Sequence, residues 1–177
     1  MANISNKAVQ MPASAIRKLV PLADAAKKEG VKVYHLNLGQ PDIKSPTCAL
    51  DAIRNFSGEN VSYSHSAGLM DLRKGLVEKY YGKMGINISV DELIVTVAGS
   101  ESVNLALEIT CNPGDEVIVL EPFYTNYNTF AFMNGLTLKA ISTDIRNGFQ
   151  IPPIEEFEKA ITDKTKAILV CNPGNPT

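Results

Sequence analysis

The sequence predicts an α/β fold, in which a mainly parallel sheet is the middle of three layers and helices cover both of its faces. From about residue 93, short apolar runs typical of buried strands alternate with longer segments whose apolar residues recur at helical spacing. Glycine, proline and asparagine separate these segments, where turns are expected. The predicted strands are 93–97, 117–120, 137–141 and 167–171, and the predicted helices among them are 99–110, 124–133 and 154–161.

The first part of the chain lacks this regular alternation. Ser14 can cap a helix that ends at Gly30, and Pro21 is expected to kink this helix or to separate its first turn from the rest. A short strand is predicted at 33–38 and a helix at 48–56. An apolar stripe from residue 69 to residue 81 predicts a long helix ending at Gly85. We therefore expect an arm, or part of a second domain, before about residue 45.

Composition excludes several classes of protein. The chain of 177 residues is 45% hydrophobic and 20% charged, with a net charge of -2, and it has no Lys/Arg run of the kind that binds nucleic acids or anionic membranes. The first thirty residues lack the apolar core of a secretory signal, which predicts a cytoplasmic protein. Three separated cysteines and two isolated histidines predict neither disulfides nor a metal site.

Three groups of candidate site residues follow successive predicted strands. Ala98, Gly99 and Ser100 open a helix, where backbone N–H groups and a hydroxyl can bind phosphate, although an ordinary capped turn has the same pattern. Tyr124 can stack on a flat ligand or can be a core aromatic residue. Asn175 can donate to an anionic oxygen or can simply form an Asn-Pro turn. Because the carboxyl ends of parallel strands meet at one edge of a sheet, these groups are expected on one rim.

Six short motifs occur in order between residues 38 and 177. They are Leu38-Gly39-Gln40-Pro41-Asp42; Tyr63 five residues before Gly68, with Asp71-Leu72-Arg73 following; Val95-Thr96-Val97-Ala98-Gly99-Ser100; Pro113-Gly114-Asp115-Glu116-Val117; Glu121-Pro122-Phe123-Tyr124; and Asn172-Pro173-Gly174-Asn175-Pro176-Thr177. With these motifs the chain resembles the amino-terminal part of a class I/II aminotransferase, a fold-type I pyridoxal-phosphate enzyme close to the aspartate and aromatic aminotransferases.

The resemblance implies pyridoxal 5′-phosphate as cofactor and assigns roles to matching residues. Ala98, Gly99 and Ser100 match the family's phosphate-binding turn, with Ala98 at a position where glycine is common. Tyr124 matches the aromatic residue that stacks on the pyridine ring, and Asn175 matches the asparagine that hydrogen-bonds the cofactor's phenolic oxygen. Tyr63 resembles the tyrosine that reaches the neighbouring subunit's cofactor phosphate, which implies a homodimer. Gly39 matches the glycine beside the substrate carboxylate, and Arg73 is expected to be structural.

The resemblance also implies a domain division and an incomplete active site. Residues 1–45 are expected to form the arm and part of the small domain, and residues 46–177 the amino-terminal half of the large cofactor-binding domain, which is incomplete at its carboxyl end. In the family the Schiff-base lysine, the aspartate facing the pyridine nitrogen and the arginine binding the substrate carboxylate follow the Asn-Pro-Thr segment. We therefore expect no catalytic residue in this chain and no aminotransferase activity from it alone, with a longer parent acting on an amino acid and a 2-oxo acid.

Other functions remain open at the level of sequence. A different fold-type I reaction, such as C–S bond cleavage, uses the same cofactor contacts. An aminotransferase-like transcriptional regulator is disfavoured, because no DNA-binding module precedes the first helix. A non-catalytic binding protein is also disfavoured, because half a sheet would expose apolar edges.

Overall fold

The computed structural model describes residues 3–14 and 16–177, so the expectations that fall on residues 1, 2 and 15 lie outside the described residues. The chain forms two compact units. The first contains the described residues up to Leu38 together with Val103–Thr177, and the second is Gly39–Ser102. The expected domain division at residue 45 stays a prediction, since it concerns the domains of a longer protein.

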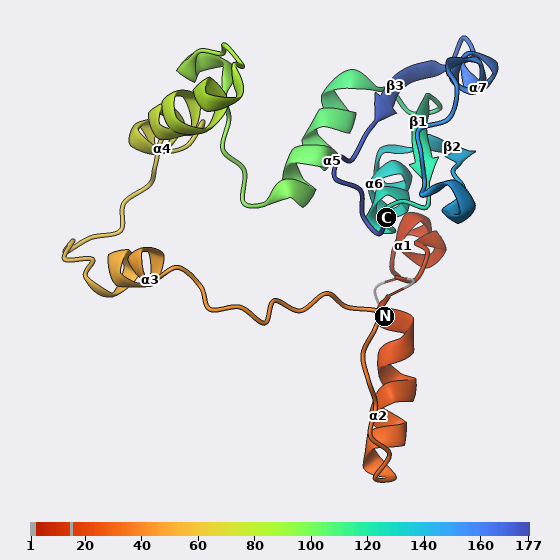
Figure 1. Cartoon of the computed structure of the whole chain (residues 1–177), viewed down its shortest axis with the longest axis horizontal. Helices are drawn as coiled ribbons and strands as arrows, with labels where there is room; N and C mark the ends of the chain where they lie inside the picture. The colour runs from red at the N-terminus through yellow and green to blue at the C-terminus, as the bar shows by residue number, and fades with distance from the viewer. Residues whose placement is uncertain (1–2, 15) are drawn as a thin grey trace. The chain divides into compact units, whose positions relative to one another are not determined.

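The first unit is built on a parallel sheet of three strands: β1 (Glu116–Glu121), β2 (Thr137–Ser142) and β3 (Thr165–Leu169). β1 lies in the middle, and both of its neighbours run parallel to it (Figure 1). Val117, Ile118 and Val119 are at most 1% exposed. Because successive residues of a strand point to opposite faces, β1 is buried on both faces, as the apolar run predicted.

Helices connect and cover these strands. α6 (Asn126–Asn134) joins β1 to β2, while η5 (Ile145–Asn147) and α7 (Ile154–Ala160) join β2 to β3. Figure 1 shows α6 and α7 beside the sheet. One core cluster joins α5 (Gly99–Thr110), β1, α6 and the residue before β2; its buried members are Leu107, Val117, Ala131 and Leu136.

A glycine and a side-chain hydrogen bond fix the end of α6. Gly135 follows the helix with a φ of +68°, and a Cβ there would lie 3.2 Å from the Cβ of Pro113. Glycine suits this position because it adopts positive φ without strain. The Asn134 side-chain amide donates to Asn104 Oδ1 at 2.9 Å and therefore ties α6 to α5.

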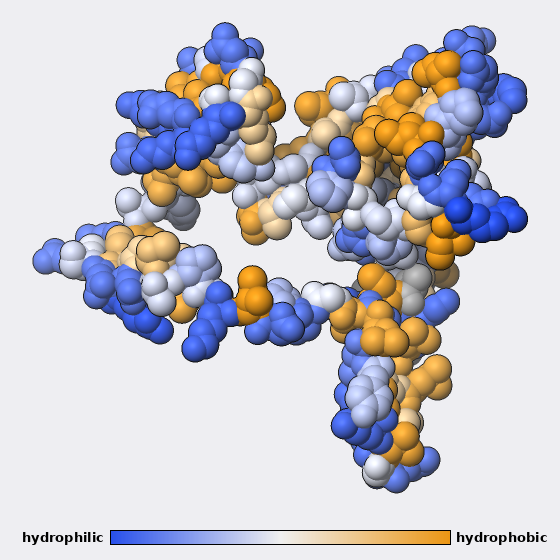
Figure 2. All heavy atoms as spheres, in the orientation of Figure 1, coloured by the Kyte–Doolittle hydropathy of each residue, from blue (hydrophilic) through white to orange (hydrophobic). Residues whose placement is uncertain are grey.

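The amino-terminal elements of the first unit are α1 (Asn6–Gln10), η1 (Arg17–Leu19) and α2 (Val20–Lys28). The Lys7 ammonium donates to the Met133 carbonyl near the end of α6, a favourable place for a cation. Apolar side chains lie at the surface of α2 (Figure 2). No helix within residues 3–14 and 16–177 combines the length and the apolar character needed to cross a bilayer.

The second unit contains α3 (Thr47–Arg54) and a helical run made of α4 (Met70–Gly75), the π-helical η2 (Leu76–Tyr81) and η3 (Gly82–Met84). The run ends at Gly85, whose φ is +72°. A further turn, η4 (Val90–Glu92), precedes the segment that leads to α5. Arg73 on α4 is only 3% exposed and donates from Nη1 to the Val90 carbonyl at 2.8 Å, which joins α4 to η4.

The predicted α/β fold and parallel sheet are confirmed, and two of the predicted strands are wrong. The segments 33–38 and 93–97 are not paired as strands with any other described residue. The apolar pattern of a segment reports its burial, whereas a strand also needs a neighbouring backbone with which to pair. Three helical turns were missed, α1, η4 and η5, because turns of three to five residues are too short to display a helical period.

Candidate functional site

The carboxyl ends of β1 and β3 border a hollow of about 270 Å³ in the first unit. Its wall contains residues from three connections at the same edge of the sheet, which is where open α/β sheets bind ligands. The lining residues that follow the three strands are Pro122, Phe123, Tyr127, Thr143, Gly148, Phe149, Ile151, Val170, Cys171, Asn172, Gly174, Asn175 and Thr177. The hollow therefore lies at the carboxyl edge of the sheet, as expected, and Asn175 lines it. The expectation that Ala98–Ser100 also follow a strand of this sheet was wrong, because 93–97 is not a strand.

Aromatic residues form one side of this hollow. The rings of Phe123 and Tyr127 stack with centroids 6.2 Å apart, and Tyr124 meets Tyr127 edge to face at 5.6 Å. Burial of the Tyr127 side chain raises the pKa of its hydroxyl above the ordinary value of 10.0, and the nearby Cys171 thiol raises this pKa further. Tyr127 is thus the buried aromatic residue of the group, and it was not among the candidate site residues predicted from the sequence.

Tyr124 lies outside the wall of the hollow. Its side chain is half-buried, and its hydroxyl accepts a hydrogen bond from the Asn126 side-chain amide at 2.7 Å. Its ring packs against Tyr127, which does line the hollow. Tyr124 therefore packs against a residue of the wall, Tyr127, while Asn175 belongs to the wall itself.

Asn175 lies in the wall of the hollow and is exposed. Within the described chain its side-chain amide makes no hydrogen bond, so both N–H donors are available to a ligand. In the same connection, the Cys171 thiol donates to the Pro173 carbonyl at 3.4 Å.

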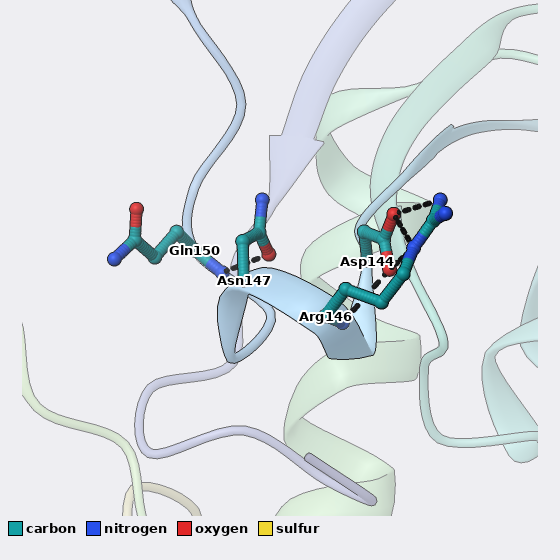
Figure 3. Close-up of polar contacts among 4 residues, drawn as sticks. All are labelled: Asp144, Arg146, Asn147 and Gln150. Atoms are coloured by element: carbon teal, nitrogen blue, oxygen red, sulfur yellow. Dashed lines mark hydrogen bonds and ion pairs between the residues drawn. The ribbon is translucent and has the colours of Figure 1, made fainter.

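The loop after β2 is a component of the site that sequence reasoning missed (Figure 3). Asp144 caps η5 by accepting from the Arg146 backbone N–H at 2.8 Å, and its carboxylate also accepts from Arg146 Nε at 2.9 and 3.0 Å. These bonds from Arg146 hold the pKa of Asp144 below its ordinary value of 3.8. The Asp144 cap and the Asn147-Gly148 pair were the available signal, because both are typical of a tight turn.

The predicted phosphate-binding turn lies in the second unit, at the start of α5. Ala98, Gly99 and Ser100 are exposed. The Ala98 carbonyl accepts from the backbone N–H groups of Glu101 and Ser102, at 3.0 and 3.3 Å. In the part of the chain that the structure describes, the N–H groups of Gly99 and Ser100 have no hydrogen-bond acceptor, as expected for the first turn of a helix. The turn therefore offers two backbone donors and the Ser100 hydroxyl to an anion.

Side chains fix the shape of this turn. Thr96 Oγ1 donates to the Ala98 carbonyl at 3.0 Å and lies 2.6 Å from Ser102 Oγ, so the Ser102 hydroxyl donates to Thr96. The Glu101 carboxylate accepts from the Val97 N–H at 2.6 Å. The turn is thus held by its neighbours, while its own donors stay free.

The last two predicted site residues, Gly39 and Tyr63, also lie in the second unit and are exposed. A Cβ built on Gly39 would meet nothing within 4 Å, so the backbone there is open to approach. The Tyr63 side chain is fully exposed. Each residue is accessible, and their roles stay predictions.

The sequence matches the family described as "Aminotransferase class I and II" over residues 31–177. It is 32% identical to the aspartate/prephenate aminotransferase of Thermus thermophilus over 178 residues, covering 100% of this chain and 46% of that protein. A solved aspartate aminotransferase mutant of Thermus thermophilus superposes with a TM-score of 0.90 at 32% identity, over 100% of this chain and 46% of the other. For the alanine aminotransferase of Pyrococcus furiosus the TM-score is 0.87 at 35% identity, over 99% and 45%. The chain therefore spans about half the length of these relatives.

Proposed function

Because the chain belongs to the class I and II aminotransferases, we propose that it supplies the amino-terminal, cofactor-binding part of a pyridoxal-phosphate aminotransferase. The whole protein would move an amino group between an amino acid and a 2-oxo acid. The observation that carries this proposal is the turn at Ala98–Ser100, with two unpaired backbone donors and a free hydroxyl at the start of a 12-residue helix.

The donor chemistry of this turn fits a phosphate group. The N–H groups of Gly99 and Ser100 and the Ser100 hydroxyl can each donate to a phosphate oxygen, and the positive end of the helix dipole favours the negative charge. The open space around Gly99, where a Cβ would meet nothing within 4 Å, leaves room for the ligand. Phosphate binding here would anchor the cofactor by the group that takes no part in the chemistry.

Residues of the first unit fit the aromatic ring of the cofactor. The free amide of Asn175 can donate to the cofactor's phenolic oxygen, and the Tyr124 ring can stack on the pyridine. Tyr127 would support Tyr124 from its edge, since the two rings meet at 89°. In this proposal Asn175 orients the ring and Tyr124 limits its tilt.

The remaining roles concern the substrate and a second subunit. The Gly39 backbone would lie beside the substrate carboxylate, where the absence of a side chain permits close approach. The fully exposed Tyr63 would donate to the cofactor phosphate of a partner subunit, so the assembly is proposed to be a homodimer. The cytoplasmic location remains a prediction from the sequence.

When bound, pyridoxal phosphate supplies an electron sink for charge at the α-carbon of an amino acid. The residues assigned here bind and orient, and none of them can move a proton at that carbon. The family's catalytic lysine matches no lysine of this chain. We therefore expect the chain by itself to give no aminotransferase turnover, and repeated turnover by the purified chain would contradict this assignment.

Cofactor binding can be tested on the chain with pyridoxine 5′-phosphate, which lacks the aldehyde that reacts with surface lysines. Titration of the ¹⁵N-labelled chain should shift the amide resonances of Gly99 and Ser100, and pyridoxine without phosphate should not. Ser100→Ala should weaken the binding about tenfold, because a hydrogen bond to a charged group is lost. Ser57→Ala, at an exposed site in the same unit, is the control and should bind as the unaltered chain does. If these two amides do not respond to the phosphate ester, the proposal fails.

A further inference from the structure

We propose that Gly68 and Val95 are positioning residues, through which the turn at residues 65–68 sets the place of the phosphate-binding turn Ala98–Ser100. This inference rests on the proposed function, because the turn that is positioned is the one assigned to the cofactor phosphate. Neither residue would touch the cofactor.

The first observation is that Val95 leaves no room for a side chain at position 68. Gly68 has a φ of +95°, and a Cβ built on it would lie 2.7 Å from Val95 Cβ and 2.8 Å from Val95 Cγ2. Real Cβ atoms do not approach this closely, so any other residue at position 68 would have to displace Val95. Since Val95 is branched at Cβ, its side chain has little freedom to rotate away and its backbone would have to move.

The second observation is a backbone connection at the same place. The Val95 N–H donates to the Ala67 carbonyl at 3.0 Å. The turn itself is fixed by two bonds to His65, whose carbonyl accepts from Gly68 N–H at 2.8 Å and whose Nδ1 accepts from Ala67 N–H at 3.1 Å. These bonds fix the conformation of the turn, and the bond from the Val95 N–H to the Ala67 carbonyl ties residue 95 to it.

The third observation is that the segment beginning at η4 is held at its other end as well. The buried Arg73 side chain donates to the Val90 carbonyl at 2.8 Å. The segment thus has fixed points at residues 90 and 95, five residues apart in the chain. Because residue 90 is fixed, a displacement of Val95 would move the residues that follow it, toward residue 98, more easily than those that precede it.

Residues 96–102 would transmit that displacement. Thr96 is bonded to the Ala98 carbonyl and to Ser102, and Val97 is bonded to Glu101, so residues 96–102 form one hydrogen-bonded unit. Moving Val95 would shift this unit and with it the N–H groups of Gly99 and Ser100. The Gly68 contact therefore sets where the phosphate donors lie.

The test uses Gly68→Ala with Gly85→Ala as its matched control. Gly85 lies in the same unit and has a φ of +72°, but a Cβ there would meet nothing within 4 Å, so the control carries the backbone strain without the collision. In the unliganded ¹⁵N-labelled chain, Gly68→Ala should shift the amide resonances of Gly99 and Ser100, and Gly85→Ala should not. Affinity for pyridoxine 5′-phosphate should fall about tenfold in Gly68→Ala, because charge-assisted hydrogen bonds lose their alignment.

A second part of the experiment removes the collision between the new Cβ of Gly68→Ala and Val95 by shortening the side chain at position 95. In the double variant Gly68→Ala/Val95→Ala the branched side chain is gone, so the Gly99 and Ser100 resonances should return toward their original positions and most of the affinity should be regained. Equal shifts in Gly68→Ala and Gly85→Ala, or no recovery in the double variant, would overturn the inference.

Failure of the proposed function would look different. If the unaltered chain does not bind pyridoxine 5′-phosphate, the cofactor assignment fails, while the amide shifts of the unliganded variants still decide whether Gly68 positions the turn. If Gly68→Ala does not fold, hydrogen exchange of the unaltered chain decides instead. The Val95 amide should exchange slowly because it is bonded to Ala67, and exchange at the rate of an unprotected amide would overturn the inference.

Discussion

Leu107→Ala is expected to destabilise the chain more than any change at its surface. Leu107 is 4% exposed and packs in the core cluster with Val117, Ala131 and Leu136. The substitution removes three buried carbons, for which the lost transfer free energy is about 2.4 kcal/mol at ~0.8 kcal/mol per methylene. The cavity left between helix and strand raises the expected cost to about 3 to 5 kcal/mol. The free energy of unfolding of a typical domain is about 5 to 15 kcal/mol, so this loss is a large fraction of the total.

The measurement is urea unfolding followed by circular dichroism, with Ile109→Ala as the control. Ile109 lies two residues further along α5 and is 81% exposed, so its truncation should change the free energy of unfolding by less than about 0.5 kcal/mol. The slope against urea should stay the same in both variants, since the surface exposed on unfolding hardly changes. If both variants lose the same stability, Leu107 does not lie in the core, and the packing of α5 on β1 described above is wrong.

Two pH-dependent effects are also expected. Because the pKa of Asp144 is lowered by its bonds from Arg146, this contact stabilises the loop above pH ~4 and is lost as pH falls through the folded-state pKa; Arg146→Ala should raise the carboxyl pKa measured by NMR, whereas Arg54→Ala should not. Because burial raises the pKa of Tyr127 above 10.0, its contribution to stability is complete below that pH and is lost as pH rises through the folded-state pKa. Tyr127→Phe should make unfolding less sensitive to alkaline pH, and an unchanged alkaline profile would contradict the burial of that hydroxyl.

The sequence predicted those parts of the fold that are governed by local chemistry. Helix ends were predicted well: the helix expected to end at Gly85 does so, and the helix expected at 124–133 ends at Asn134, directly before Gly135. Both glycines have positive φ, which glycine adopts without strain. Pro21 lies in the first turn of α2, where its missing N–H costs nothing. The strand at 93–97 was wrongly predicted because strand formation depends on a neighbouring backbone, which no local pattern encodes.

The candidate site was predictable where residues have a strong chemical signature and otherwise was not. The edge of the sheet followed from the parallel order of strands, and the helix start at Gly99 followed from its turn. The loop after β2 was missed because the residues by which it lines the hollow, Thr143, Gly148, Phe149 and Ile151, have no recognisable motif and are brought there by the turn that Asp144 caps. The packing of Gly68 beside Val95 was missed because the two residues are 27 apart in the sequence, and it shows only in the lack of space for a Cβ at position 68.

The residues of β1 that stabilise the fold differ from the residues proposed to contact a ligand. The strand is completely buried at Val117–Val119, whereas Glu121 is exposed, residues 122–125 after it are half-buried, and residues 170–177 after β3 are exposed. Substitution of the exposed candidates Ser100 and Asn175 should therefore alter binding with little effect on unfolding. Tyr127 is the exception, because it is 8% exposed and also lines the hollow. Its ring supports both Phe123 and Tyr124, so a change at Tyr127 affects packing and the shape of the hollow together. Substitutions that change ligand binding without loss of stability are consequently expected at the exposed positions, whereas Tyr127 is needed both for packing and for the shape of the hollow.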